Sequence, residues 1–265
     1  MQMNTQAQGI ATSEQRRGTV FTRLRSYFVY VPLVYLYTLV MGVFSLLSSL
    51  FDSSGRVQHW FARTWSRMIL KTGPIKVHIE GLENIPAGQP VVYAANHLSA
   101  MDIPVLYAML PGQFRIMAKK ELFRYPVLGW HLKRSGQIPI VLGDAHASVG
   151  TLKRAGRALR HGLPLMVFPE GGRSETGQLQ PFLGGAFFAA IAEQAPVVPI
   201  AIVGTYEMLP MNSFHVVPGP VQLVIGRPVA TTGMRLRDLE RLAAQVRDAI
   251  AEMYDTHAKA ITSNA

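Results

Sequence analysis

Short apolar runs alternate with longer amphipathic stretches from residue 74 to the end of the chain. Runs of this length, rich in Val and Ile, are typical of buried strands. The predicted strands are Lys76–Glu80, Val91–Ala95, Arg115–Ala118, Gln137–Val141, Leu165–Phe168, Val197–Val203 and Val221–Ile225. The predicted helices are Ala100–Leu110, Pro126–Lys133, Ala145–His161, Gly184–Gln194 and Leu236–Lys259. This order predicts an α/β fold with a largely parallel sheet of about seven strands flanked by helices.

Pro199 interrupts one of these patterns, because it lies inside the otherwise ideal strand Val197–Val203. Proline cannot donate a ladder hydrogen bond, so it predicts an edge strand or a bulge. An edge position is the simpler of the two interpretations.

The N-terminal region has a different pattern. Residues from Tyr27 to Phe51 include no charged side chain, and as a helix they extend roughly 37 Å, enough to cross a bilayer. The following stretch repeats Val57, Trp60 and Trp65 at helical spacing, with arginines on the other side, as in an interfacial amphipathic helix. Basic residues flank the apolar run on both sides, so a spanning helix and a monotopic helical pair both fit.

These patterns divide the chain into three segments: a mobile N-terminus at 1–18, a membrane-associated helical pair at 19–73, and an α/β domain at 74–265. The formal net charge is +10 and the mean hydropathy is +0.18, which together favour an anionic membrane as partner. No nucleic-acid-binding motif is present, so we expect no nucleic-acid partner. The chain has no cysteine, which excludes disulfides and thiolate zinc sites, and no histidine spacing predicts a metal site.

The stretch Ala94–Asp102 carries the first candidate chemistry. A buried strand delivers His97 to a loop, and Ser99 with Asp102 three residues later resembles a capping box, so a helix begins near Ser99. With His97 in the loop and Asp102 in the first turn, carboxylate and imidazole can meet, which makes His97 a candidate base. The alternative is that Asp102 only caps the helix.

Two further stretches carry candidate binding groups. Phe168–Ser174 is a strand end followed by Pro169, two glycines and Arg173; such a turn exposes backbone N–H groups, and a guanidinium suits phosphate. Glu170 is expected to accept a hydrogen bond from an acceptor or to hold Arg173. Lys119 and Lys120 follow another strand, where they either meet a phosphate or form a solvated rim.

These stretches, taken together, resemble the glycerolipid acyltransferase family. The motif N-H-x-x-x-x-D is matched by Asn96, His97 and Asp102, and F-P-E-G-x-R by Phe168 to Arg173. The other two motifs are matched by Lys120–Phe123 with Pro126, Gly129 and Gly136–Ile140, and by Val198–Ile200. The sequence departs from the family at Gly172, where threonine is frequent, and at Leu142, where arginine is usual.

The resemblance implies transfer of a fatty acyl group from acyl-CoA or acyl carrier protein to the sn-2 hydroxyl of 1-acylglycerol-3-phosphate. His97 and Asp102 would be catalytic, with no metal or other cofactor. The resemblance assigns substrate binding to Asn96, Lys119, Lys120, Glu170, Gly171, Gly172 and Arg173, and an acyl pocket to Leu122, Phe123, Val198 and Pro199. It also implies a catalytic domain on the cytoplasmic face of the inner membrane.

Three alternatives stay open at this point. Because Leu142 replaces the usual arginine, another lyso-lipid or a glycolipid is a possible acceptor. The same groups also suit a phospholipase or transesterase, which would not depend on a thioester. A non-catalytic lipid-binding protein that has kept the fold is the third alternative.

Overall fold

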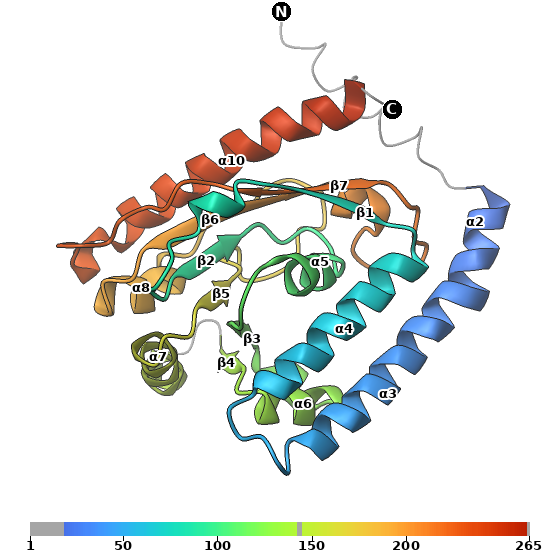
Figure 1. The fold of residues 1–265 in the computed structure, drawn as a ribbon. Coiled ribbons are helices and arrows are strands. Elements are labelled where there is room, and N and C mark those ends of the chain that lie inside the picture. Colours follow the sequence, from blue (N-terminus) through green and yellow to red (C-terminus); the bar gives the residue numbers. More distant parts are fainter. Residues whose placement is uncertain (1–18, 142–144, 264–265) are drawn as a thin grey trace, which may run out of the picture.

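The computed structural model describes residues 19–141 and 145–263, and its centre is one seven-stranded sheet (Figure 1). The strands are β1 (Lys76–Glu80), β2 (Val92–Ala95), β3 (Arg115–Lys119), β4 (Ile138–Ile140), β5 (Leu165–Val167), β6 (Val197–Val203) and β7 (Pro220–Ile225). Their order is β1-β7-β6-β2-β5-β3-β4, and every pairing is parallel except the antiparallel pair β6 and β7. The predicted α/β fold with a largely parallel sheet is therefore confirmed.

Helices cover both faces of the sheet. One face packs against α4 (Arg56–Thr72) and α5 (Asp102–Met109), and the other against α7 (Ala145–Arg160), α8 (Phe188–Ala192) and α10 (Leu239–Ser263) (Figure 1). Two short helices, α6 (Leu128–Arg134) and α9 (Thr205–Met208), follow β3 and β6. The three inner strands β2, β5 and β6 are buried along their whole length, which explains their uninterrupted apolar sequences.

The prediction that Pro199 marks an edge strand is wrong. β6 lies in the interior of the sheet, between β7 and β2. The antiparallel pairing with β7 ends at Ile200 opposite Ile225 and resumes as a single bridge between Val197 and Val229, with one residue more on the β7 side. The Pro199 carbonyl accepts from Gly226 within this irregular stretch, so the missing N–H of Pro199 falls at a bulge rather than at an edge.

The N-terminal part is a helical hairpin. A continuous helix runs from Val20 to Ser48 as α2 (Val20–Arg25), a π-helical segment (Ser26–Tyr30) and α3 (Val31–Ser48), and α4 returns alongside it (Figure 1). The π-helical segment directly precedes Pro32, whose ring would clash with a carbonyl of a regular preceding turn. By length and composition this helix could cross a membrane. The predicted mobile segment 1–18 and Leu142 lie outside the described residues.

The hairpin is attached to the α/β domain along one side only. Tyr37 and Thr72 form a hydroxyl–hydroxyl bond of 3.2 Å between α3 and α4, and the Trp65 indole donates to Thr38 at 3.0 Å. Arg63 of α4 donates to the backbone carbonyls of Tyr107, Leu110 and Gly112, beside the end of α5. The opposite side of α3 faces outward and carries exposed apolar side chains, namely Tyr35, Leu36, Leu39, Val40, Val43, Phe44 and Leu47. These exposed side chains fit association with a membrane.

Candidate active site

The candidate residues gather at the edge of the sheet where the parallel strands end. His97 follows β2, Lys119 ends β3, the turn 168–174 follows β5, and Thr205 follows β6. Because β3, β5, β2 and β6 are neighbours in that order, these segments are side by side in space. Ligands of open α/β sheets bind at this edge.

His97 and Asp102 are in direct contact. The Nδ1 atom of His97 lies 2.8 Å from Oδ2 of Asp102, as the combination of a loop histidine and a first-turn aspartate predicts. The helix α5 itself begins at Asp102, three residues later than the sequence predicts, because Ser99 to Met101 form a turn. Half of the predicted capping box is present, since the N–H of Ser99 donates to Asp102, but the Ser99 hydroxyl accepts the N–H of Met101 and the N–H of Asp102 donates to the Ser99 carbonyl.

Asp102 is fully buried and uses both carboxylate oxygens. Oδ2 accepts the backbone N–H groups of Leu98 and Ser99 in addition to the His97 contact. Oδ1 accepts the hydroxyl of Thr205 at 2.6 Å. A carboxylate held by four donors cannot rotate freely, so the orientation of the imidazole is fixed as well.

Thr205 is a residue that the sequence patterns did not single out. It begins α9 directly after Gly204, whose φ of 93° lies in the left-handed region. A Cβ at Gly204 would lie 2.4 Å from the carbonyl oxygen of Pro220, so a side chain does not fit there. The signal available in the sequence was this glycine after a buried strand, which turns the chain so that the next side chain reaches Asp102.

The other ring nitrogen of His97, Nε2, has no hydrogen-bond partner within the described chain, and the side chain is 16% exposed. The ring of Phe168 stacks on the imidazole, with centroids 4.1 Å apart and 23° between planes. The stacking leaves the Nε2 edge open while it restricts the tilt of the ring. An imidazole held at Nδ1 with a free Nε2 is the arrangement of a general base.

Glu170 supports the histidine from the backbone side. Its Oε1 accepts the N–H of His97 at 2.7 Å, and its Oε2 accepts the N–H of Gln180 at 3.0 Å. Burial raises the pKa of Glu170, and the two N–H donors oppose that shift. The expected contact with Arg173 is absent from the ion pairs of the described residues. Glu170 therefore links the turn after β5 to the His97 loop.

The turn 168–174 presents two backbone donors. Gly171 has a φ of 75°, and its N–H is used by the carbonyl of Phe168. The N–H of Ser174 is used by the carbonyl of His97. Among the described hydrogen bonds, the N–H groups of Gly172 and Arg173 have no partner, so they are available to an anionic oxygen.

Two positively charged side chains lie at the site, one at the end of β3 and one in the turn after β5. A Cβ on Gly172 would lie 3.3 Å from the Nζ atom of Lys119, so the ammonium group lies against the backbone of this glycine. The Arg173 side chain is exposed, and no hydrogen bond or ion pair of it is found in the described structure. Lys120 is exposed and begins the 3₁₀ segment Lys120–Arg124. Lys119 and Arg173 thus form the cationic side of the site, next to the free N–H groups.

The part of the chain that holds these groups is similar to known proteins. Residues 76–203, which include β1 to β6 and all of the groups described above except Thr205, match the family model named Acyltransferase. These residues therefore form an acyltransferase-family domain.

Several relatives are named for the same activity. A 1-acyl-sn-glycerol-3-phosphate acyltransferase of Brassica napus, named BAT2 and chloroplastic, is 35% identical over 207 residues, which cover 77% of this chain and 58% of the relative. The human 1-acyl-sn-glycerol-3-phosphate acyltransferase alpha is 29% identical over 181 residues, which cover 68% of this chain and 64% of the human protein. The chain therefore spans less than two thirds of these relatives.

A solved structure covers more of the chain. The crystal structure of the 1-acyl-sn-glycerophosphate (LPA) acyltransferase PlsC from Thermotoga maritima has a TM-score of 0.71 and 26% sequence identity. The match covers 91% of this chain and 97% of that one. The similarity therefore extends beyond residues 76–203 to the N-terminal helices or the C-terminal part.

The remaining candidate residues occupy different surroundings. Asn96 is fully buried, and its side chain donates to the carbonyl of Ile202 and accepts the N–H of the same residue, so it joins the ends of β2 and β6. Val198 and Pro199 are buried inside the sheet, Phe123 is buried in its 3₁₀ segment, and Leu122 is half exposed.

An apolar cavity of about 300 Å³ lies beside the turn 168–174, and none of the four acyl-pocket candidates lines it. The turn contributes three residues to the wall of this cavity: Phe168, Pro169 and Gly171. The other lining residues come from β3, β4 and the residue after it, α7, the end of β5, and the segment that leads into α8: Met117, Ile140, Val141, Thr151, Leu152, Val167, Leu183, Gly185, Ala186 and Phe188. Hydrophobic spacing in the sequence did not single out this cavity, because its walls come from five separate segments.

Proposed function

We propose that this chain transfers a fatty acyl group from an acyl thioester to the free sn-2 hydroxyl of 1-acylglycerol-3-phosphate, with phosphatidic acid as the product. The donor is acyl-CoA or acyl carrier protein. The observation that carries the proposal is the 2.8 Å contact between His97 and a buried Asp102 at the carboxyl edge of the sheet. The activity for which the relatives are named supports the choice of acceptor.

The proposed chemistry is a direct transfer. Nε2 of His97 takes the proton of the acceptor hydroxyl, and the oxygen attacks the thioester carbonyl. The N–H groups of Gly172 and Arg173 stabilise the negative oxygen of the tetrahedral intermediate. The C–S bond then breaks, and His97 returns the proton to the departing thiolate. The new ester and a free thiol are the products, and the steps need neither a metal nor a cofactor.

The two cations account for acceptor binding. Lys119 lies against Gly172, and Arg173 follows in the same turn, so a phosphate between them would lie beside the oxyanion donors. The apolar cavity next to Gly171 is a suitable volume for an acyl chain, because its end at Phe168 adjoins the imidazole. Acceptor phosphate and acyl chain would then enter the site from opposite sides of the turn.

The helical hairpin supports a location in one leaflet of the membrane. One side of α3 packs on α4, and α4 carries exposed Arg56, Arg67 and Lys71. If α3 crossed the bilayer, these charges would enter the hydrocarbon region at a cost of several kcal/mol. An orientation along the surface buries only the apolar side of α3. The catalytic domain then faces the compartment that holds acyl thioesters, the cytoplasm.

The decisive experiment compares acceptors. Purified protein in detergent is given a labelled long-chain acyl-CoA or acyl carrier protein, with lysophosphatidic acid or with lyso-lipids that lack a phosphomonoester. We expect product from lysophosphatidic acid only, and a loss of at least about a thousandfold in His97→Ala. Product from another lyso-lipid would keep the chemistry and change the substrate. Undiminished turnover in His97→Ala would refute the role of the histidine.

A further inference from the structure

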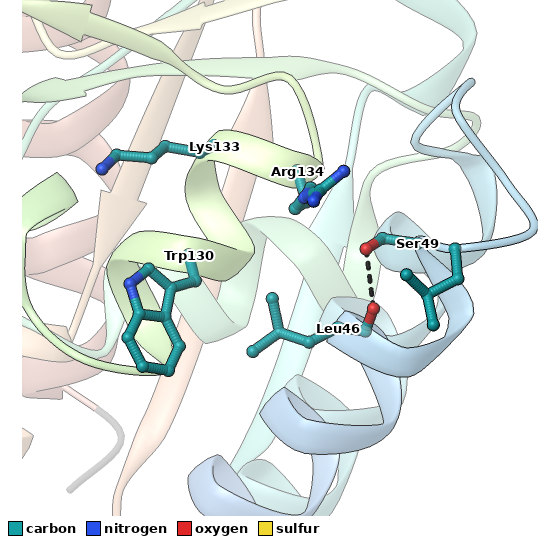
Figure 2. Close-up of a pocket in the computed structure, with 6 residues that line it drawn as sticks. Leu46, Ser49, Trp130, Lys133 and Arg134 are labelled. Atoms are coloured by element: carbon teal, nitrogen blue, oxygen red, sulfur yellow. Dashed lines mark hydrogen bonds between the residues drawn. The ribbon is translucent and has the colours of Figure 1, made fainter.

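A second cavity shares no lining residue with the cavity beside the turn 168–174. It has a volume of about 320 Å³ and separates the end of α3 from α6 (Figure 2). We call it the α3–α6 cleft, and its walls are Leu46, Ser49 and Leu50 on one side and Trp130, Lys133 and Arg134 on the other. Figure 2 shows Leu46 directed toward the indole of Trp130, with Arg134 next to Ser49 at the opening.

None of the reacting groups lines the cleft. Gly136, which follows α6, lies against the guanidinium of Arg115, and Arg115 is the first residue of β3. Lys119, at the other end of the same strand, lies in the candidate active site. The length of β3 alone separates the two ends of the sheet by roughly 13 Å. The cleft is therefore a separate feature and not an extension of the catalytic site.

The two walls are held together without any charge. The Ser45 hydroxyl lies 2.7 Å from Nδ1 of His131, which joins α3 to α6 one turn from the cleft. Burial lowers the pKa of His131 to about 4, so this contact is neutral at physiological pH. A Cβ on Gly42 would lie 2.4 Å from Cγ1 of Val127, which shows how closely the two segments approach. The cleft is preformed by these contacts.

The charge of the cleft is uncompensated. Lys133 and Arg134 are exposed, and neither takes part in an ion pair found in residues 19–141 and 145–263. The sequences of α3 and α6 contain no aspartate or glutamate. The nearby carboxylate of Asp52 is already used by the N–H groups of Ser54 and Val57. Lys133 and Arg134 therefore line the cleft without an anionic partner, with Arg134 beside Ser49 and the ammonium of Lys133 directed away from Ser49 (Figure 2).

The rest of the cleft is apolar and borders the outward side of α3. Leu50 is 69% exposed and Trp130 is 53% exposed, and the neighbouring Phe51 is 92% exposed. Tryptophan beside lysine and arginine is the arrangement found where proteins meet the headgroup layer of a bilayer. A soluble anion would use the two cations but would gain nothing from Leu46, Leu50 and Trp130. A ligand with a phosphate and a hydrocarbon chain uses both.

We propose that the α3–α6 cleft binds one anionic phospholipid of the membrane, with its phosphate on Arg134, the exposed side chain of Lys133 rotated toward that phosphate, and a chain along Leu46, Leu50 and Trp130. The bound lipid would attach the end of α3 and the neighbouring α6 to the membrane. The proposal concerns binding and does not depend on the catalytic function proposed above.

The test measures lipid binding to the full-length protein in detergent by native mass spectrometry, with phosphatidylglycerol and phosphatidylcholine as probes. We expect one retained phosphatidylglycerol per chain and at least tenfold weaker phosphatidylcholine binding. The double variant K133A/R134A should weaken phosphatidylglycerol binding about thirtyfold. The matched control K153A/R154A, an adjacent exposed Lys–Arg pair on α7, should stay within twofold of the wild type.

A second pair of variants tests the apolar wall. Trp130→Ala should weaken phosphatidylglycerol binding, whereas Trp60→Ala, with a similarly exposed indole on α4, should not. Equal losses in K133A/R134A and K153A/R154A would mean diffuse attraction and would overturn the proposal. Displacement of the lipid by free CoA would also overturn it, because the cleft would then be a donor site.

Discussion

The active-site edge of the sheet and the outward side of the N-terminal helix treat polar and apolar groups in opposite ways. At the sheet edge, polar side chains are buried and each has its partners, as for Asn96, Ser99, Asp102 and Thr205. On the N-terminal helix, large apolar side chains are exposed. Of the 26 large apolar residues that are exposed in the described chain, 15 lie between Val20 and Phe51.

The difference identifies the surroundings that each region requires. A buried carboxylate is tolerated only when donors surround it, and the same donors fix its geometry for chemistry. An exposed apolar surface of this extent is tolerated only when something other than water covers it. The buried polar groups of the first region therefore find their hydrogen-bond partners within the chain. The exposed apolar side chains of the second region need a partner to cover them, which we propose to be the membrane. Variants that exchange polar and apolar groups in either region test this distinction.

The largest loss of activity is expected when the hydrogen-bond network around the buried Asp102 is broken; we call this the self-contained network. Asp102→Asn keeps the size of the side chain but places an amide where Oδ2 accepts three donors. We expect kcat to fall by about 10³ to 10⁴, since the imidazole loses the group that orients it and stabilises its charged form. The buried mismatch should also lower stability by about 1–3 kcal/mol. Thiol release from the acyl donor measures the first effect, and thermal unfolding measures the second.

Glu83→Gln is the control for that variant, because Glu83 is an exposed carboxylate on a surface segment. It should change neither quantity. A kcat of Asp102→Asn within tenfold of the wild type would show that Asp102 serves only as the helix cap, the alternative that the sequence left open.

A smaller effect is expected where the outward surface is made polar. The double variant Leu36→Glu and Leu39→Glu changes two half-exposed side chains of α3. Each loses the burial of an aliphatic side chain, about 1.5–3 kcal/mol, so binding to vesicles should weaken at least about a hundredfold. Co-sedimentation with phospholipid vesicles gives the affinity.

The matched control replaces two leucines of similar exposure elsewhere, Leu82→Glu and Leu236→Glu. We expect this control to bind vesicles as the wild type does, and both double variants to keep the thermal stability of the wild type. Unchanged vesicle binding in Leu36→Glu and Leu39→Glu would contradict the assignment of α3 as the membrane-facing element.

The sequence predicted the self-contained region well, and the reason is local. Strand positions followed from short apolar runs, and β1 and β6 match the predicted residues at both ends. The His97–Asp102 contact followed from a loop and a helix start five residues apart. Both signals lie within one short stretch of sequence, where chain geometry limits the possible arrangements.

Contacts between distant segments were not predictable from such signals. Pro199 was assigned to an edge, because strand order depends on crossovers that no local pattern encodes. Glu170 was expected to accept a hydrogen bond from an acceptor or to hold Arg173; it does not hold Arg173, because its partners are the backbone N–H groups of His97 and Gln180. The walls of the cavity beside Gly171 and of the α3–α6 cleft come from elements far apart in the sequence. Whether the hydrophobic run spans the membrane was likewise left open by its length alone.

Thr205 offers the finest test of the comparison, because it changes one hydrogen bond of the buried network and no charge. Its hydroxyl donates to Oδ1 of Asp102, on the side of the carboxylate away from His97. Thr205→Val keeps the shape and removes this donor, so Asp102 keeps its contact with the imidazole but loses part of its fixed orientation. We expect kcat to fall about tenfold with an unchanged KM for the acceptor, since Thr205 positions Asp102 and does not touch substrate.

Thr205→Ser is the conservative control, because it restores the hydroxyl and should restore most of kcat. The removed donor should also shift the pH dependence of kcat relative to the wild type, whereas a merely structural defect would lower kcat at every pH by the same factor. Equal losses in Thr205→Val and Thr205→Ser would show that packing of the methyl group, rather than the hydrogen bond, matters at this position. Restored activity in Thr205→Ser would show that the hydrogen-bond network around Asp102 includes Thr205, which lies two residues after the end of the family match at Val203.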